Sequence, residues 1–226
     1  MSKHLMRDLE KVKKTILTMG SVVEDAMNRA ITAVTYRRPE LAEDVLRGED
    51  AINLMEIEIE EECLKILALH QPVAADLRFI IAMLGVNRDL ERMGDLAVNI
   101  AERALYLAAH DPIQVPINFP EMMNKVRAMV RESLDALVNL DAPLARGVCR
   151  KDDEVDEINR QMFTILEDLI RREPETVDRA IHTLSVSRHL ERIADLATNI
   201  AEDVVFMVEG EVIRHHFEDY RRQAMR

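Results

Sequence analysis

The chain has 226 residues, of which 48% are hydrophobic and 32% charged, with six glycines, no tryptophan and few aromatic side chains. That composition favours the packing of Leu, Ala and Met between helices over a pleated sheet, so we predict an all-α protein. The formal net charge of −12 and the pI near 5.1 argue against a nucleic-acid-binding protein, because such proteins neutralise phosphates with a basic surface.

No segment of the sequence has the composition of a membrane or secretion signal. Residues 1–14 mix Lys, Arg, Asp and Glu, and no later stretch approaches the length of an apolar membrane-spanning run. We therefore predict a cytoplasmic protein with no transmembrane segment. Cys63 and Cys149 lie far apart and outside any Cys/His cluster, which predicts neither a disulfide framework nor a structural zinc site.

Prolines divide the chain into segments of helical length, because proline is tolerated in the first turn of a helix and disfavoured inside it. The predicted helices cover residues 3–36, 39–69, 72–109, 120–140, 143–171 and 174–208. A linker with two prolines, 111–118, separates two groups of three, and a short tail begins at Gly210. The predicted organisation is a pair of tandem three-helix bundles, residues 1–110 and 118–209, followed by a tail over residues 210–226.

The last helix of each half carries the same motif, with an offset of one hundred residues. Residues 84–102 (LGVNRDLERMGDLAVNIAE) match residues 184–202 (LSVSRHLERIADLATNIAE) at about two positions in three. A weaker match relates residues 47–53 to residues 150–156. The two halves share the order of their segments as well as one motif, which indicates a duplicated unit.

Each copy of the motif places a row of oxygen-bearing side chains on one helix face. On a helical wheel four side chains of each copy fall within one quadrant, opposite an apolar face: Glu91, Asp95, Asn99 and Glu102 in the first, and Glu191, Asp195, Asn199 and Glu202 in the second. Carboxylates four residues apart on a helix repel each other by about 0.2–0.5 kcal/mol unless a cation lies between them. The duplicated row therefore needs an explanation.

Two explanations remain open. Arg88 and Arg92 each precede an acid of the row by three residues, so ordinary surface ion pairs could offset the repulsion. A bound metal ion is the other, because the second helices add oxygen donors at matching intervals: Glu49 with Asn53, and Asp152 with Asp156. Carboxylate and amide oxygens are the ligands that Mg²⁺, Ca²⁺, Mn²⁺ and iron prefer.

The segment LERMGDLAVNIAE, residues 90–102, resembles the signature of the PhoU family, and QPVAADLR, residues 71–78, resembles another segment of that family. The resemblance covers about residues 9–208. It implies a pseudo-twofold pair of three-helix bundles whose E(D)xxxD motifs hold divalent or trivalent metal ions such as iron or zinc, in multinuclear clusters where several bind. Carried over by position, the implied metal ligands are Glu91, Asp95, Glu191 and Asp195, supplemented by Glu49, Asn53, Asp152 and Asp156.

The resemblance also implies a function. It points to a non-enzymatic regulator of phosphate uptake and phosphate signalling, which damps the phosphate-specific ABC transporter and keeps its sensor kinase switched off. The implied partners are the ATPase subunit of the transporter and the phosphate-responsive sensor histidine kinase, at the inner face of the membrane, and a second copy in a homodimer. The alternative is a metal-storage or metal-dependent redox bundle. The chain contains no P-loop, dinucleotide-binding, HExxH or GxSxG motif and no Glu-x-x-His pair, which favours the regulatory interpretation.

Overall fold

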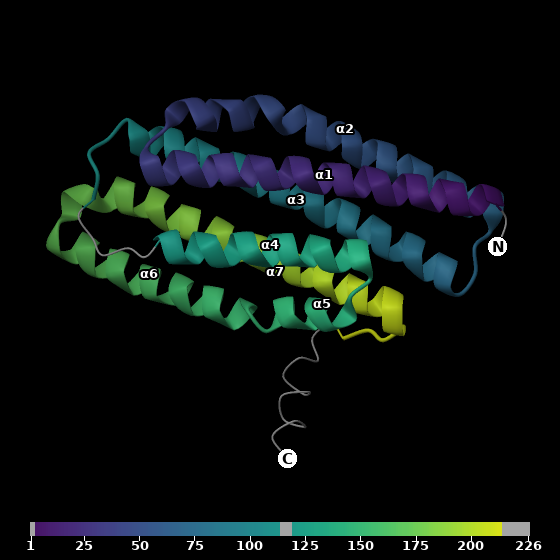
Figure 1. Cartoon of the computed structure of the whole chain (residues 1–226). Coiled ribbons are helices and arrows are strands. Elements are labelled where there is room, and N and C mark those ends of the chain that lie inside the picture. Colours follow the sequence, from purple (N-terminus) through teal and green to yellow (C-terminus); the bar gives the residue numbers. More distant parts are fainter. Residues whose placement is uncertain (1–2, 114–118, 214–226) are drawn as a thin grey trace, which may run out of the picture.

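The computed structural model describes residues 3–113 and 119–213, which are almost entirely helical (Figure 1). The first half consists of α1 (Lys3–Tyr36), α2 (Pro39–His70) and α3 (Ala75–Ala108). The second half consists of α4 (Phe119–Asn139), α5 (Ala142–Cys149), α6 (Asp152–Arg172), a 3₁₀ turn at Pro174–Thr176 and α7 (Val177–Glu209). The predicted all-α fold of two tandem three-helix bundles is confirmed, and the described residues contain no strand.

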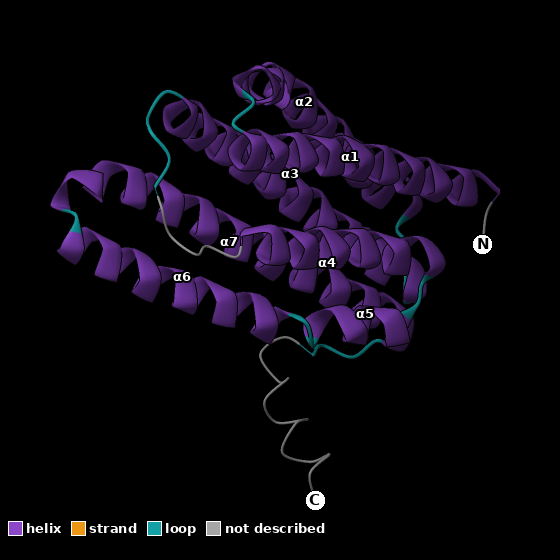
Figure 2. Ribbon diagram, turned by 60° about the vertical axis from the view of Figure 1, so that its left-hand side comes forward, coloured by secondary structure: helices purple, strands orange, loops and turns teal. Residues whose placement is uncertain are grey.

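The third helices of the two halves, α3 and α7, pack against each other in the middle of the molecule (Figure 2). In the first half α1 and α2 pack on α3, and in the second half α4, α5 and α6 pack on α7. Figure 1 shows α2 and α6 at the two outer edges. One continuous apolar core runs through both halves, because buried methionines and aliphatic side chains such as Met19, Met93 and Met129 belong to the same cluster. The two bundles therefore share one core instead of standing apart.

The single helix predicted over residues 143–171 is wrong in one respect, because it is broken into α5 and α6. Arg150 and Lys151 form a turn between them, and Lys151 Nζ donates to both carboxylate oxygens of Glu132 on α4, at 2.5 and 2.6 Å. The break makes the acidic residues 152–154 the first turn of α6. The N-terminus of a helix carries a partial positive charge that favours acidic side chains, so this position is suited to them.

The third helices begin three residues later than predicted, at Ala75 and Val177. Ala74 has a φ of +50°, a left-handed conformation that cannot continue into α3 from the preceding residues, and the segment before α7 forms a 3₁₀ turn. α7 ends at Glu209, and the residue that caps it is Gly210, whose φ of +76° lies in the region that glycine adopts at little cost. The predicted linker and tail continue into residues 114–118 and 214–226, which lie outside the described residues.

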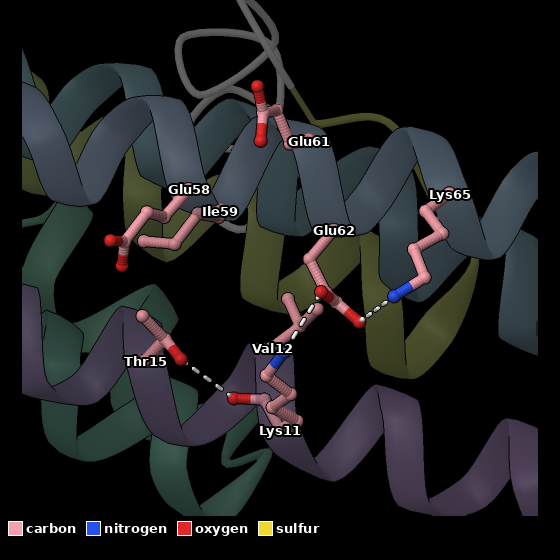
Figure 3. Close-up of a pocket in the computed structure, with 8 residues that line it drawn as sticks. All are labelled: Lys11, Val12, Thr15, Glu58, Ile59, Glu61, Glu62 and Lys65. Carbon is pink, nitrogen blue, oxygen red and sulfur yellow. Dashed lines mark hydrogen bonds and ion pairs between the residues drawn. The ribbon is translucent and has the colours of Figure 1, made fainter.

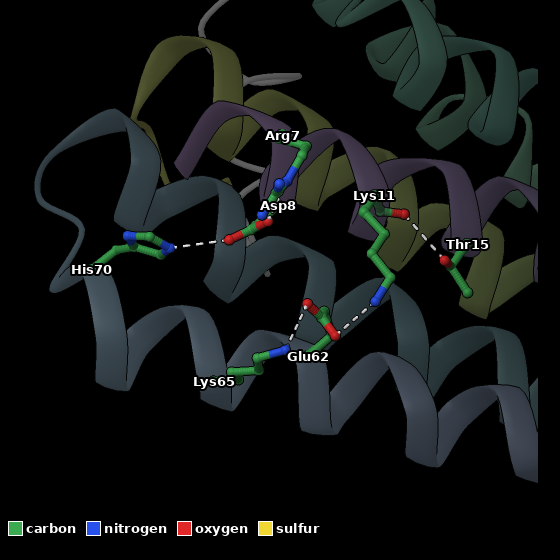
Figure 4. Close-up of polar contacts among 7 residues, drawn as sticks. All are labelled: Arg7, Asp8, Lys11, Thr15, Glu62, Lys65 and His70. Carbon is green, nitrogen blue, oxygen red and sulfur yellow. Dashed lines mark hydrogen bonds and ion pairs between the residues drawn. The ribbon is translucent and has the colours of Figure 1, made fainter. Parts of the chain in front are cut away.

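Polar contacts join the first turns of α1 to the last turns of α2. Asp8 Oδ2 lies 3.1 Å from His70 Nε2, and Lys11 Nζ lies 2.9 Å from Glu62 Oε2 (Figure 4). Lys65 approaches the same Glu62 carboxylate at 3.7 Å. Lys11 and Glu62 also line a small pocket of about 280 Å³ between the two helices (Figure 3). These contacts hold the N-terminal turns of α1 against α2.

Candidate metal centre

The second copy of the acidic row lies beside the first turns of α6. Glu191 and Asp195 lie one turn apart on α7, and Asp152 and Asp156 lie one turn apart on α6. Burial, followed by the negative charges of Asp195 and Asp156, raises the pKa of Asp152 to about 7. Burial and the charges of Asp195 and Asp156 also raise the pKa of Glu191. The four carboxyl groups predicted for this half are therefore close enough to repel one another.

One oxygen of Asp152 is left without a partner by the protein itself. Its Oδ1 atom is buried and accepts no hydrogen bond from a described residue. A buried acceptor without a hydrogen bond costs about 1–3 kcal/mol, and more where it is charged. A cation bound between α6 and α7 would satisfy this oxygen and offset the repulsion among its neighbours. The donor set consists of carboxylate oxygens, so it fits a hard or borderline cation such as Mg²⁺, Mn²⁺ or iron.

The first copy of the row is arranged differently. Burial, then the charges of Asp95 and Glu56, raise the pKa of Glu91. Glu56 is held beside this pair because Asn87 Nδ2 donates to its backbone carbonyl at 2.9 Å. The sequence reasoning missed Glu56, although it lies one turn after Asn53 on the same helix face.

The spacing between the second and third helices is set by an apolar pair next to the rows. A Cβ atom at Gly94 would lie 3.0 Å from Ile52 Cδ1 and 3.2 Å from its Cγ2. In the second half the corresponding positions hold Ala194 and Val155, both buried. In the second half the smaller Val155 of α6 is thus paired with the larger Ala194 of α7. In the first half the larger Ile52 of α2 is paired with Gly94 of α3.

The structure brings the predicted ligands together unevenly. All four carboxyl groups of the second half interact, as described above. In the first half Glu91 and Asp95 lie one turn apart on α3, whereas Glu49 and Asn53 are partly buried on either side of Ile52. Within residues 3–113, these two side chains make no hydrogen bond or ion pair with the acids of α3. The second half is therefore the stronger candidate for a metal site.

The ion pairs predicted for the first acidic row differ from those in the structure. In the described part of the chain, the ion pair of the first row joins Arg103 to Glu102 at 2.8 Å, and neither Arg88 nor Arg92 makes one. The charge of Arg92 lowers the pKa of Glu91, but burial and the neighbouring carboxyls outweigh it. The ion pairs that the spacing of Arg88 and Arg92 predicted are therefore absent from the described residues, although Arg103 pairs with Glu102 of the same row.

The acidic rows do not form a closed coordination shell. Across residues 3–113 and 119–213, no three His, Cys, Asp or Glu side chains are gathered tightly enough to hold a metal ion. A metal would therefore have to draw the carboxylates of α6 and α7 closer together.

The same residues include no helix with both the length and the apolarity required to cross a bilayer.

Comparison with known proteins connects both halves to one family. The PhoU domain model matches residues 16–104 and, a second time, residues 119–204. The chain belongs to the PhoU domain family. The two matches to this PhoU domain fall on α1–α3 and on α4–α7, so each half of the structure carries one copy of the family's unit.

Relatives of this PhoU-family chain resemble it along nearly its whole length. The phosphate-specific transport system accessory protein PhoU homolog of Aquifex aeolicus is 41% identical over 211 residues, which span 93% of this chain and 96% of that protein. The crystal structure of PhoU from Pseudomonas aeruginosa has a TM-score of 0.88 at 37% identity and covers 91% of this chain and 99% of that one. The phosphate transport system regulatory protein PhoU of Streptococcus pneumoniae has a TM-score of 0.82 at 28% identity, with coverage of 92% and 98%. These similarities confirm the family resemblance and the fold it implies.

Proposed function

We propose that this PhoU-family protein is a non-enzymatic regulator of phosphate transport. The observation that carries the proposal is its full-length similarity to proteins named as accessory or regulatory components of phosphate transport systems. The similarity covers both halves, so each half matches the same PhoU domain and neither half matches as a separate catalytic domain. The sequence also lacks the motifs of nucleotide hydrolysis, hydride transfer and triad chemistry.

In finer terms, we propose that it acts at the cytoplasmic face of the membrane on two partners. These are the ATPase subunit of the phosphate ABC transporter and the phosphate-responsive sensor histidine kinase. The protein would restrain the activity of both partners when phosphate is plentiful. It would act as a homodimer. Long helices packed on one core present a broad rigid surface, which supports a role in docking to other proteins.

We further propose that Asp152, Asp156, Glu191 and Asp195 hold a metal ion, and that Glu91 and Asp95 hold another with Glu49, Asn53 and the newly identified Glu56. The raised pKa and the unpaired oxygen of Asp152 support the first of these sites. When bound, the metal would supply positive charge where the protein alone displays a negative patch. Complementarity to an anionic partner surface would then depend on metal occupancy.

The metal assignment can be tested by replacing two ligands together, Glu191→Ala with Asp195→Ala. We expect the purified variant to lose metal from the second half, measured as moles of metal per chain by elemental analysis. The matched control is Asp168→Ala with Asp178→Ala, which removes two exposed carboxylates outside the rows. Unchanged metal content in the first variant would show that the ligands are misassigned.

The regulatory assignment can be tested in cells that lack the protein. We expect the deletion to raise phosphate uptake under phosphate-replete conditions, and the wild-type chain to restore restraint. Pull-down should recover the transporter ATPase and the kinase. Unchanged uptake on deletion together with no association would contradict the regulatory proposal. A metal-storage bundle, in contrast, would take up many metal ions per chain and leave phosphate uptake unaffected.

A further inference from the structure

A groove of about 790 Å³ opens at the end of the molecule where α1 begins. It lies between the starts of α1 and α3 on one side and the α4–α5 turn and the end of α7 on the other. Leu9, Phe79 and Met207 are its less exposed lining, while Met6 and Leu140 are 47% and 46% exposed. Its volume lies within the roughly 300–1,000 Å³ of clefts that bind ligands. None of its lining residues belongs to the acidic rows.

The groove is lined by three cationic and two acidic side chains, on a protein that is strongly acidic as a whole. Residues 3–14 contain five Lys or Arg and two acids, although the chain has a net charge of −12. Arg7 is paired with Asp8 at 3.2 Å, whereas Lys3 and Lys13 make no ion pair with any described residue. The charged residues that line the groove are Lys3, Arg7 and Lys13, with the acids Glu10 and Asp76. Two of these cations are therefore available to an anionic ligand.

The groove exists because the two halves of the molecule are unequal. α1 has 34 residues and α4 has 21, yet both end a few residues before a proline in the first turn of the next helix, Pro39 or Pro143. The additional turns of α1 therefore lie at its N-terminal end and have no counterpart in α4. Those turns supply six of the eleven residues that line the groove.

At the opposite end of the molecule the chain covers the corresponding place with its own backbone. Arg179, which corresponds to Phe79 of the groove, donates to the carbonyl of Asp111 at 3.1 Å, so the segment after α3 crosses the start of α7. The segment after α7 takes a different course, because Glu211 lies 3.7 Å from Arg146 on α5. Polypeptide thus occupies one of the two places, while the described chain leaves the other uncovered.

We propose that this groove binds an acidic amphipathic helix of a protein partner. The apolar face of that helix would contact Met6, Leu140 and the side chains between them, and its carboxylates would face Lys3 and Lys13. This deepens the proposed function by assigning a partner surface, and it rests on that function only in taking the partner to be a protein.

Two other occupants fit the observations less well. Residues 214–226 contain four arginines and two acids, so this segment has a net positive charge that would face Lys3 and Lys13. A bilayer is flat, whereas much of the apolar lining is recessed within a concave groove. Both are tested as competing outcomes.

The experiment uses the full chain and a fluorescein-labelled peptide of about 18 residues, roughly five helical turns, with Leu along one face and Glu on its flanks. We expect saturable binding by fluorescence anisotropy that weakens as salt rises. A scrambled peptide of the same composition and a peptide with Lys in place of Glu should bind at least about tenfold more weakly. The proposal would be overturned if the scrambled peptide bound as tightly as the amphipathic acidic peptide, or if the amphipathic acidic peptide did not bind.

Matched variants locate the site. Met6→Glu and Lys13→Glu should each weaken peptide binding by at least about tenfold. Lys14→Glu makes the same charge change outside the groove, and Phe163→Glu changes an exposed apolar residue on α6, so both should stay within about twofold of the wild type. Circular dichroism verifies that each variant is folded. If the lining variants bind as the wild type does, the groove is not the site.

Two further arms separate the competing occupants. If the peptide binds only after Phe217→Ser with Tyr220→Ser, the chain's own C-terminal segment occupies the groove and the proposal fails. If the wild type binds vesicles of phosphatidylglycerol and phosphatidylcholine, and Met6→Glu abolishes that binding while the peptide does not bind, the surface is a membrane contact and the proposal also fails. Neither arm measures phosphate uptake, so failure here leaves the regulatory proposal standing.

Discussion

Removing the charge of Asp152 should stabilise the metal-free protein. In the folded chain the pKa of this carboxyl is raised from 3.8 to about 7, first by burial and then by Asp195 and Asp156. Between about pH 4 and pH 7 the unfolded chain therefore binds fewer protons at this position than the folded chain, so the free energy of unfolding falls as pH rises through that window. Asp152→Asn keeps the shape of the side chain and eliminates this loss.

The size of the effect follows from the same values. A difference of about three pH units corresponds to about 4 kcal/mol as an upper limit. Because the carboxyl is partly accessible to water, which screens its interactions, we expect a gain of about 1–2 kcal/mol at pH 8 and a smaller gain at pH 5. The assay is urea unfolding followed by circular dichroism in the presence of a chelator.

Glu154→Gln is the matched control, because it removes a carboxylate from the same first turn of α6. The hydrogen bond from Lys125 holds the pKa of Glu154 below its usual value, so this substitution should destabilise the protein at pH 8. Added Mn²⁺ or iron should raise the stability of the wild type more than that of Asp152→Asn, since binding to the folded state stabilises it. The reasoning is refuted if Asp152→Asn is no more stable than the wild type at pH 8 with chelator.

Three further predictions concern the packing of the helices. Gly94→Ala should change the free energy of unfolding more favourably, by about 1 kcal/mol, in an Ile52→Val background than in the wild type. The reason is that Ile52→Val removes the Cδ1 atom that a Cβ at position 94 would meet at 3.0 Å. A double-mutant cycle by urea unfolding measures this coupling, and additive effects would contradict it. Gly85→Ala should cost about 1–3 kcal/mol or more, because its Cβ would meet a buried carboxylate of α7, and an unfolding free energy within about 0.5 kcal/mol of the wild type would be inconsistent with that contact. His70→Gln should raise the pKa of Asp8 towards its ordinary value, since the His70 hydrogen bond is the main cause of its lowering. The stability that the Asp8 carboxylate contributes is present above about pH 4 and is lost as pH falls, so the variant should lose less stability on acidification than the wild type. An unchanged Asp8 titration by ¹³C NMR would exclude this account.

Helix-level features followed from local rules that act along the chain. Prolines and the 3.6-residue period placed the helices, and the repeated motif predicted that Glu91 and Glu191 would occupy equivalent positions on the third helices. Those positions are confirmed as partly exposed helix faces. Their role as metal ligands stays a prediction.

Other features depended on what one helix contributes to another. Glu56 reaches the Glu91 environment because α2 packs on α3, where Asn87 donates to the Glu56 backbone carbonyl across 31 positions of sequence. The break at Lys151 arises where its ammonium group reaches Glu132 on α4. Neither contact leaves a periodic signal in the sequence.

The sequence by itself determined the helices, the duplication and the acidic face of each repeat, because these follow from side-chain order along a single element. Only the tertiary structure decided that Asp152 is crowded by the carboxylates of α7, that the two bundles share one core through α3 and α7, and that the first turns of α1 border an open groove. The physical reason is that burial and electrostatic repulsion depend on distances between elements, which neither periodicity nor spacing along the chain specifies.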